Sequence, residues 1–251
     1  MKNKFIPVDN NINKAIAFAN TLDSNNIVNV QKIKQKPFYI PTMDVVERLQ
    51  NEGWLLKGVA EHRVKSKKVE SNYVQMQHPD FSVLNKQGKT EAYTSITIAN
   101  SCSGAKPLQM SLGVFRQVCT NGAIAFDQHG ESEIIKHTEV NFMNLQNFIA
   151  AMTNKTGHLL NSVNEMKHRG LNIEQMKKLA YEAAKLKYSD LRDINTDALL
   201  TINRIEDEGN DVWTVFNRIQ ENLTHDITNM NRDIKINQQL FAMAEQYAFA
   251  V

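Results

Sequence analysis

Apolar and polar residues alternate through the first half of the chain, which is the pattern of half-buried β-strands. The residues that share one strand face are Thr94, Ile96 and Ile98 in one run and Leu108, Met110, Leu112 and Val114 in the next. The polar turn Asn100–Gly104 separates the two runs, so together they predict a β-hairpin. Strands are predicted over about 54–64, 73–78, 93–99 and 108–118. Short turns join antiparallel neighbours, so these strands predict an antiparallel meander.

Helical periodicity flanks the strands. Thr42 is a candidate N-cap for a helix over 43–51, which Gly53 would end. From Asn144 apolar residues recur every three or four positions, which predicts one long helix ending near Gly170. Three later apolar stripes contain Met176, Leu179, Ala180, Ala183 and Leu186; Val212, Val215, Phe216, Ile219 and Leu223; and Leu240, Phe241, Ala244 and Tyr247. We expect the stripes to pack on one another and on one sheet face, with oligomer contacts as the alternative.

These elements predict an α+β fold, in which an antiparallel β-sheet, a β-hairpin meander, packs against helices and a C-terminal helical layer follows. The predicted organisation is an N-terminal arm over 1–41, a sheet domain with a basic surface over 42–140, and a helical region packed on the sheet over 141–251. A short helix is expected in the arm, around 12–22. The acidic run Glu206–Asp211 predicts a solvated loop that places Asp211 at the next helix N-terminus.

Composition narrows the class of protein. The 251 residues are 42% hydrophobic and 22% charged, which is typical of a globular chain, and the net charge is only +2. Any nucleic-acid surface must therefore be a local patch. No apolar run is long enough to cross a membrane, and the N-terminus lacks the apolar core of a signal peptide. Two cysteines without a secretion signal favour reduced thiols, so we expect a soluble intracellular protein.

Several longer motifs carry a family resemblance. The run GVFRQVCTNG at Gly113–Gly122 follows the turn NSCSG, and the second half contains VWTVFNRIQENL at 212–223, RDIKINQQL at 232–240 and then AEQYA. Together, from about Trp54 to Ala248, they resemble a phage- and plasmid-encoded family known as domain of unknown function 932. The resemblance implies a phage or mobile-element protein in the host bacterial cytoplasm. It also implies a remote similarity to Rad-fifty-two-type single-strand annealing proteins, whose cores order a β-β-β-α unit.

The strongest local signal for function is basic charge on the predicted sheet. Residues 53–118 hold nine Lys or Arg against four acids, an excess of five in a chain of net charge +2. The nine are Lys57, Arg63, Lys65, Lys67, Lys68, Lys86, Lys89, Lys106 and Arg116. Such a surface suits phosphates, and Trp54, Tyr73 or Tyr93, if exposed, would stack on bases. The alternative is that the run RVKSKK is a solvated turn or a protected sheet edge.

Arg116 has two possible roles. It shares the face of Leu112 and Val114, where an unpaired charge is costly, so it needs a partner or must lie at the strand end. The first role is a structural ion pair with an acid of the helical layer, and the second is a phosphate clamp. Its place in the family run does not decide between them.

Catalytic signatures are weak, and we expect no enzyme, metal, nucleotide or other cofactor. The seven histidines are scattered and form no metal-ligand spacing, and Cys102 and Cys119 lack a CxxC spacing. No glycine-rich phosphate loop precedes a helix. Cys119 as a nucleophile with a distant histidine is an alternative to a buried thiol, so an undetected hydrolase is kept as a residual hypothesis.

The function expected from these patterns is ATP-independent binding of single-stranded DNA, or of RNA, with strand annealing or recombination in phage DNA metabolism. Lys and Arg of the hairpin strands would hold phosphates while bases stay available for pairing, and a homo-oligomeric ring or filament would extend the groove. The second hypothesis is a phage-encoded inhibitor that binds a protein of a host defence system. Binding of single strands with a steep salt dependence separates the first hypothesis from the second.

Overall fold

The computed structural model describes residues 6–7, 38–63, 69–85, 87–101, 106–116, 124–126, 133–190, 195–227 and 229–250. Most of the predicted arm, including its helix around 12–22, lies outside these residues, as do both cysteines. The central element is an antiparallel meander. Its strands are β2 (Leu55–Arg63), β3 (Val69–Leu84), β4 (Thr90–Ser101) and β5 (Leu108–Arg116). The predicted α+β class and meander are confirmed.

Short strands complete the sheet at both edges. The strand β1 (Ile6–Pro7) pairs with β2, while β6 (Ile124–Phe126) and β7 (Glu133–Ile135) both pair with β5. All of these pairings are antiparallel. Within the described residues the sheet therefore has seven strands, of which the four meander strands form the centre.

The strand β3 is much longer than its alternating pattern predicted. The prediction stopped at His78. Pro79 and Asp80 follow, and both residue types are rare in regular strands. In the structure the register shifts between Gln77 and Ser82, so the breakers lie at an irregularity where a ladder hydrogen bond is not required. The strand then resumes its pairing with β4 as far as Leu84.

The register separates the two faces of the meander. On one face Val74, Ile98 and Met110 are cross-strand neighbours, and all three are buried in the main hydrophobic core. One residue along each strand, side chains point to the opposite face. That face carries two rows, Tyr73–Ala99–Gln109 and Gln75–Thr97–Ser111. The first face is called the apolar face below and the second the polar face.

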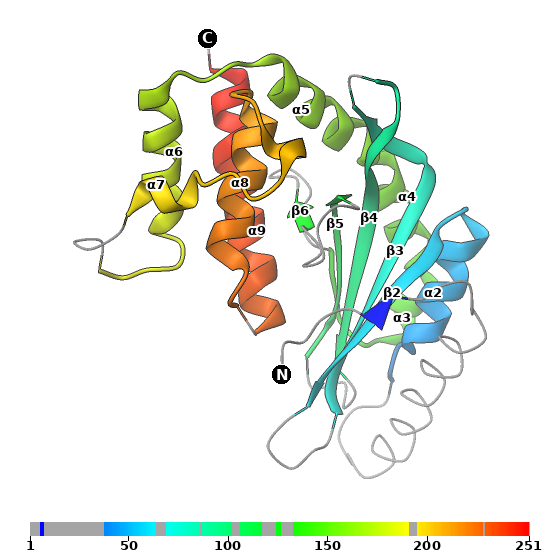
Figure 1. Ribbon diagram of the computed structural model, residues 1–251. Coiled ribbons are helices and arrows are strands. Elements are labelled where there is room, and N and C mark those ends of the chain that lie inside the picture. The colour runs from blue at the N-terminus through cyan, green and yellow to red at the C-terminus, as the bar shows by residue number, and fades with distance from the viewer. Residues whose placement is uncertain are drawn as a thin grey trace.

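Helices lie on both sides of the sheet. The first group is α2 (Thr42–Asn51), α3 (Glu139–Met143), α4 (Leu145–Asn154) and α5 (Thr156–His168). The second is α6 (Ile173–Ala184), α7 (Thr196–Leu199), the 3-10 helix η1 (Ile205–Asp207), α8 (Val212–Thr224) and α9 (Met230–Phe249). Figure 1 shows α2–α4 on one side of the sheet and α6–α9 on the other. Among the described helices, none is long and apolar enough to cross a membrane.

The start of α2 differs from the prediction. The N-cap is Pro41, and Thr42 is already helical. The Thr42 hydroxyl instead donates to the Asn72 side-chain oxygen at 3.0 Å and accepts from the Asn100 amide at 3.1 Å. The threonine therefore fastens the helix to β3 and β4 rather than capping it. The predicted end is correct: Gly53 follows the helix with φ of 88°, a conformation that favours glycine.

The single helix predicted over 144–170 is two helices, α4 and α5, that meet at Lys155. The Thr156 hydroxyl donates to the Thr153 carbonyl at 2.6 Å and competes there for a backbone acceptor. Thr153 also receives the indole N–H of Trp54 at 3.3 Å, which ties the break to the start of the sheet. Apolar periodicity continues through the break because both helices face one core, so the pattern alone did not reveal it.

Most residues of the other predicted stripes are buried in α6, α8 and α9, and Met176, Leu186 and Tyr247 pack against the same core partly buried. Phe216 and Phe241 meet edge to face with ring centroids 5.7 Å apart, which joins α8 to α9. The predicted position of Asp211 is confirmed, since it is the N-cap of α8 and accepts the Thr214 amide at 2.9 Å. The helical layer is therefore internally packed as well as packed on the sheet.

Candidate functional site

A cavity of about 500 Å³ lies between the polar face of the sheet and α9. Tyr73 and Ala99, which are neighbours on β3 and β4, line the sheet side, and Gln109 lines it from β5. Helix α9 contributes Ile234 and, one helical turn later, Gln238. Ile234 packs on Tyr73 in a small apolar cluster, so this contact holds the helix against the sheet at one wall of the cavity.

The cavity is cationic. Its charged lining residues are Lys106, just before β5, and Lys235 on α9, and none of the described lining residues is acidic. Both lysines are exposed. Two residues before Lys235, burial raises the pKa of Asp233 to about 7, although a hydrogen bond from Asn237 lowers it. Asp233 is therefore partly protonated near neutral pH. This arrangement suits an anionic ligand.

The segment that carries Lys106 is held by a histidine. His137 accepts the Ile40 amide at Nδ1, at 3.2 Å, and its other ring nitrogen lies 3.0 Å from the Lys106 carbonyl. Because a neutral imidazole has one acceptor and one donor, Nε2–H donates to that carbonyl. The ring also stacks on Tyr39 at a centroid distance of 5.0 Å. The backbone of Lys106 is thus fixed while its side chain remains exposed.

The structure brings together only some of the residues expected to bind nucleic acid. Tyr73 and Lys106 line the cavity. Lys57 is exposed on β2. Lys89 is exposed in the β3–β4 connection, at the other end of β4 from Lys106. Arg63 ends β2, but its side chain is not among those described. The remaining predicted lysines, Lys65, Lys67, Lys68 and Lys86, lie outside the described residues.

The expected stacking surfaces need correction. Trp54 is 0% exposed and Tyr73 is 2% exposed, so neither ring lies open on the surface as base stacking there would require. Trp54 belongs to the core. It lies just before β2, and its ring packs edge-on against the His78 ring, with the ring centroids 5.3 Å apart. Tyr73 is covered by Ile234 of α9. Tyr93 is half-buried on β4, opposite Phe115.

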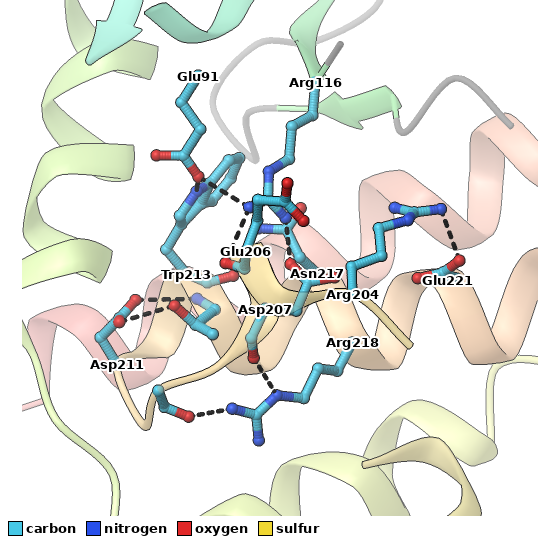
Figure 2. Close-up of polar contacts among 12 residues, drawn as sticks. Glu91, Arg116, Arg204, Glu206, Asp207, Asp211, Trp213, Asn217, Arg218 and Glu221 are labelled. Carbon is cyan, nitrogen blue, oxygen red and sulfur yellow. Dashed lines mark hydrogen bonds and ion pairs between the residues drawn. The ribbon is translucent and has the colours of Figure 1, made fainter. Parts of the chain in front are cut away.

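Arg116 takes the structural role of its two predicted roles. It is 2% exposed and forms ion pairs with Asp207, and with Glu91 at 3.2 Å. Figure 2 shows its side chain reaching from β5 to η1, with Glu91 and Trp213 beside it. The prediction of an ion pair with an acid of the helical layer is confirmed. Its assignment as a nucleic-acid contact is corrected, because a buried, paired guanidinium is not presented to a ligand.

The acidic run Glu206–Asp211 is largely exposed, as predicted for a solvated loop, but the prediction is wrong at Asp207. Asp207 is 0% exposed, because it pairs with Arg116. Arg218 on α8 donates to the carbonyls of Asp207, at 2.6 Å, and Gly209. Asp207 and its two arginines therefore form a buried junction that joins the sheet to α8, while Glu206, Glu208 and Asn210 are exposed.

Glu91 completes this junction from β4. It accepts the Trp213 indole N–H at 2.8 Å and pairs with Lys167 of α5 at 2.8 Å. Burial alone raises the pKa of Glu91, but the hydrogen bonds from Lys167 and Trp213 and the charge of Arg116 outweigh it and lower the pKa overall. Glu91 is therefore held ionised as a structural anion.

Sequence reasoning missed the contribution of α9. Lys235 and Gln238 line the cavity, yet in the sequence they are polar positions of an amphipathic helix. Gln109 is likewise an ordinary polar position of an alternating strand. The only usable signal was the polar character of the strand face itself. Among the described residues, no group of three or more His, Cys, Asp or Glu side chains is placed to hold a metal ion.

Comparison with known proteins identifies two relatives and a family. Two Escherichia coli K12 proteins, UPF0380 protein YfjQ and UPF0380 protein YafZ, are each 26% identical to this chain over 230 residues. Each alignment covers 82% of this chain and 81% of the relative. No solved structure matches. The family model described as Domain of unknown function (DUF932) matches residues 35–244, and the chain therefore belongs to the DUF932 family.

Proposed function

We propose that this protein binds single-stranded DNA at the cavity between the sheet and α9, without ATP, and that it promotes strand annealing or recombination for a phage or mobile element. The observation that carries the proposal is the lining, which contains two lysines, several amides and hydroxyls and, among the described residues, no carboxylate. Such a surface neutralises phosphates and offers hydrogen bonds to bases or sugars. The excess of Lys and Arg over acidic residues in 53–118 supports the same ligand class.

The proximity along the chain of the cavity residues to the basic run 63–68 supports the proposal further. Arg63 pairs with Val69 at the end of the β2–β3 hairpin, and Ser71, two residues later, lines the cavity. The run that contains Lys65, Lys67 and Lys68 joins these strands in the chain. Further cations therefore lie near Ser71 along the protein chain, in addition to Lys106 and Lys235 at the cavity.

Binding is tested by fluorescence anisotropy of a labelled single-stranded oligonucleotide at about 50 and 200 mM salt. Changing Lys106 and Lys235 to Ala together should weaken binding and reduce the slope of log K against log salt by about 0.7 for each lost phosphate contact. The matched control changes the exposed lysines Lys178 and Lys185 at α6, which should leave affinity and slope unchanged. The same assay with an oligoribonucleotide measures the preference for DNA over RNA.

Two outcomes would contradict the proposal at different levels. If the Lys106 and Lys235 double variant binds like the unchanged protein, the cavity is not the site. A second variant with Arg63, Lys65, Lys67 and Lys68 changed to Ala then tests the basic run 63–68. If the unchanged protein fails to bind single strands even at low salt, the DNA-binding function is rejected. The remaining hypothesis is then a protein-binding inhibitor of a host defence system.

Annealing and assembly are part of the same proposal. Their support is the remote similarity to annealing proteins, which implies a ring or filament of subunits. Annealing of two complementary labelled strands should proceed without ATP and in the presence of a chelator. Light scattering with and without oligonucleotide should show a homo-oligomer. A strict monomer that still anneals strands would remove the ring or filament from the mechanism.

A further inference from the structure

We propose that one unpaired nucleotide enters the cavity base first, so that its base lies between β3–β5 and α9 while its phosphate contacts Lys106 and Lys235. This inference rests on the proposed function and specifies how the strand is held. It assigns the cavity to a nucleotide of a single strand rather than to a phosphate at a surface cluster. The consequences are a requirement for unpaired bases and competition by a free mononucleotide.

The size of the cavity is the first argument. Its volume of about 500 Å³ lies within the range of about 300–1,000 Å³ that is usual for small-molecule pockets. A phosphate group alone would leave most of this space unfilled. A nucleotide combines an anionic group with a flat ring system, and it matches the volume as well as the charge.

The distribution of lining groups is the second argument. Ala99 and Ile234 give apolar surface on the sheet and on α9, while Gln109 and Gln238 place amides on those same two walls. An amide both donates and accepts hydrogen bonds, as the edges of bases do. The lysines lie on the segment before β5 and on α9. The lining therefore offers apolar surface and amides to a base, and two cations to a phosphate.

The polar face next to the cavity is the third argument. In the neighbouring row, the Gln75 side-chain nitrogen and the Thr97 hydroxyl are buried and have no hydrogen-bond partner among the described residues. Buried polar groups without partners are costly, and each calls for an explanation such as a ligand or water. This face of the sheet is thus unlike a hydrophobic core and is able to receive a polar ligand.

The test separates bases from phosphates. Affinity is measured for an ordinary single-stranded oligonucleotide and for an abasic oligonucleotide of equal length, with thymidine monophosphate and inorganic phosphate as competitors. The abasic strand should bind about tenfold more weakly, because it loses the contacts of a held base. Thymidine monophosphate should compete at concentrations at which inorganic phosphate does not. A fully paired duplex of the same sequence should bind more weakly than the single strand.

Variants locate the base. Ala99→Leu adds side-chain volume inside the cavity. It should therefore weaken binding of the ordinary strand about tenfold and leave the affinity for the abasic strand unchanged. Gln109→Met removes the amide at similar side-chain volume. It should also weaken binding of the ordinary strand relative to the abasic strand, and this effect does not depend on filling the cavity. Ala150→Leu, on the exposed surface of α4 across the sheet, is the matched control and should change neither affinity. Thermal unfolding of each variant confirms that it is folded.

Equal affinity for ordinary and abasic strands would overturn this inference while leaving the proposed function intact, since the protein would then hold phosphates alone. Competition by inorganic phosphate as strong as that by thymidine monophosphate would overturn it in the same way. If Ala99→Leu and Gln109→Met are folded and bind the ordinary strand normally, the base does not enter this cavity. Absence of binding to any single strand would reject the proposed function itself.

Discussion

The two faces of the β2–β5 meander are both largely buried, yet they consist of different residues. The apolar face contributes Val74, Met76, Ile96, Ile98, Met110 and Leu112 to the main core. The polar face contributes the buried residues Gln75, Gln77, Ser95, Thr97 and Ser111. Folding therefore removes both faces from water, but only one of them gains the hydrophobic stabilisation that normally drives such burial.

Alternation of apolar and polar residues alone therefore does not reveal the role of a strand face. An antiparallel sheet commonly leaves its polar face in water, and the pattern here is the same as in such a sheet. In this protein α9 lies over part of that face and encloses the cavity with it. Polar groups have been placed where solvent is excluded, which supports a role in holding a polar ligand. The apolar face, in contrast, has the role of the core.

The largest expected effect comes from the charged end of the apolar face. Arg116→Met should destabilise the fold by about 3–5 kcal/mol, because it leaves the buried Asp207 carboxylate without its ion-pair partner, while Glu91 keeps Lys167. Urea unfolding followed by circular dichroism measures the loss. Arg169→Met at an exposed position is the control, and its effect should stay within about 0.5 kcal/mol. A loss as small as that of the control would show that the buried network does not hold the sheet to α8.

A large-to-small change within the apolar face should have the next largest effect. Ile98→Ala should lower the free energy of unfolding by about 2–4 kcal/mol, because Ile98 is fully buried and a cavity would remain. The measurement is the same urea titration, with the m-value compared to confirm that the denatured state is unchanged. A loss below about 1 kcal/mol would mean that this face is less tightly packed than the structure indicates.

Helix α9, which covers part of the polar face, should give a pH-dependent effect. Burial raises the pKa of Asp233 from an ordinary value to about 7, so stability should be greatest below the unfolded pKa and should fall as pH rises through about 7. Asp233→Asn should remove this fall, which we expect to be on the order of 2 kcal/mol between pH 4 and pH 8 because the group is only partly buried. Melting temperatures across this range measure it. Parallel curves for variant and unchanged protein would contradict the shift.

The smallest effect is expected on the polar face itself. Thr97→Val keeps the side-chain shape and removes a buried hydroxyl that has no partner among the described residues. Stability should be unchanged or rise by up to about 1 kcal/mol, in contrast to the loss at the adjacent Ile98. Differential scanning calorimetry resolves this difference. A clear loss of stability would show that the hydroxyl has a structural hydrogen bond in the folded protein.

Much of the fold could be predicted because local patterns and tertiary packing agree. The alternation in β4 and β5 predicted correctly which apolar residues share a strand face, and most residues of the stripes of α6, α8 and α9 are buried. The errors lie where a local signal was overridden. Pro79 and Asp80 sit inside a long strand, and Thr42 is used for a tertiary hydrogen bond instead of a cap. Tertiary contacts outweigh propensities worth less than about 1 kcal/mol.

The candidate site was predicted only in outline. The charge excess pointed to the sheet, and Lys106 does line the cavity, but Lys235 comes from a helix more than a hundred residues further along the chain. Composition also did not distinguish the exposed Lys106 from the buried Arg116. The partner of Arg116 was foreseen as an acid of the helical layer, but its position in a run of acidic residues suggested solvent instead.

The sequence by itself determined the secondary structure classes, the antiparallel meander and the apolar face, because hydrophobic periodicity is a local property that packing then satisfies. Only the tertiary structure decided that the polar face is covered, that Asp207 is buried and that α9 completes a cationic cavity. These features depend on which distant surfaces meet. Burial and pairing are properties of contacts between elements, and a single strand or helix carries the same polar pattern whether water or another helix lies against it.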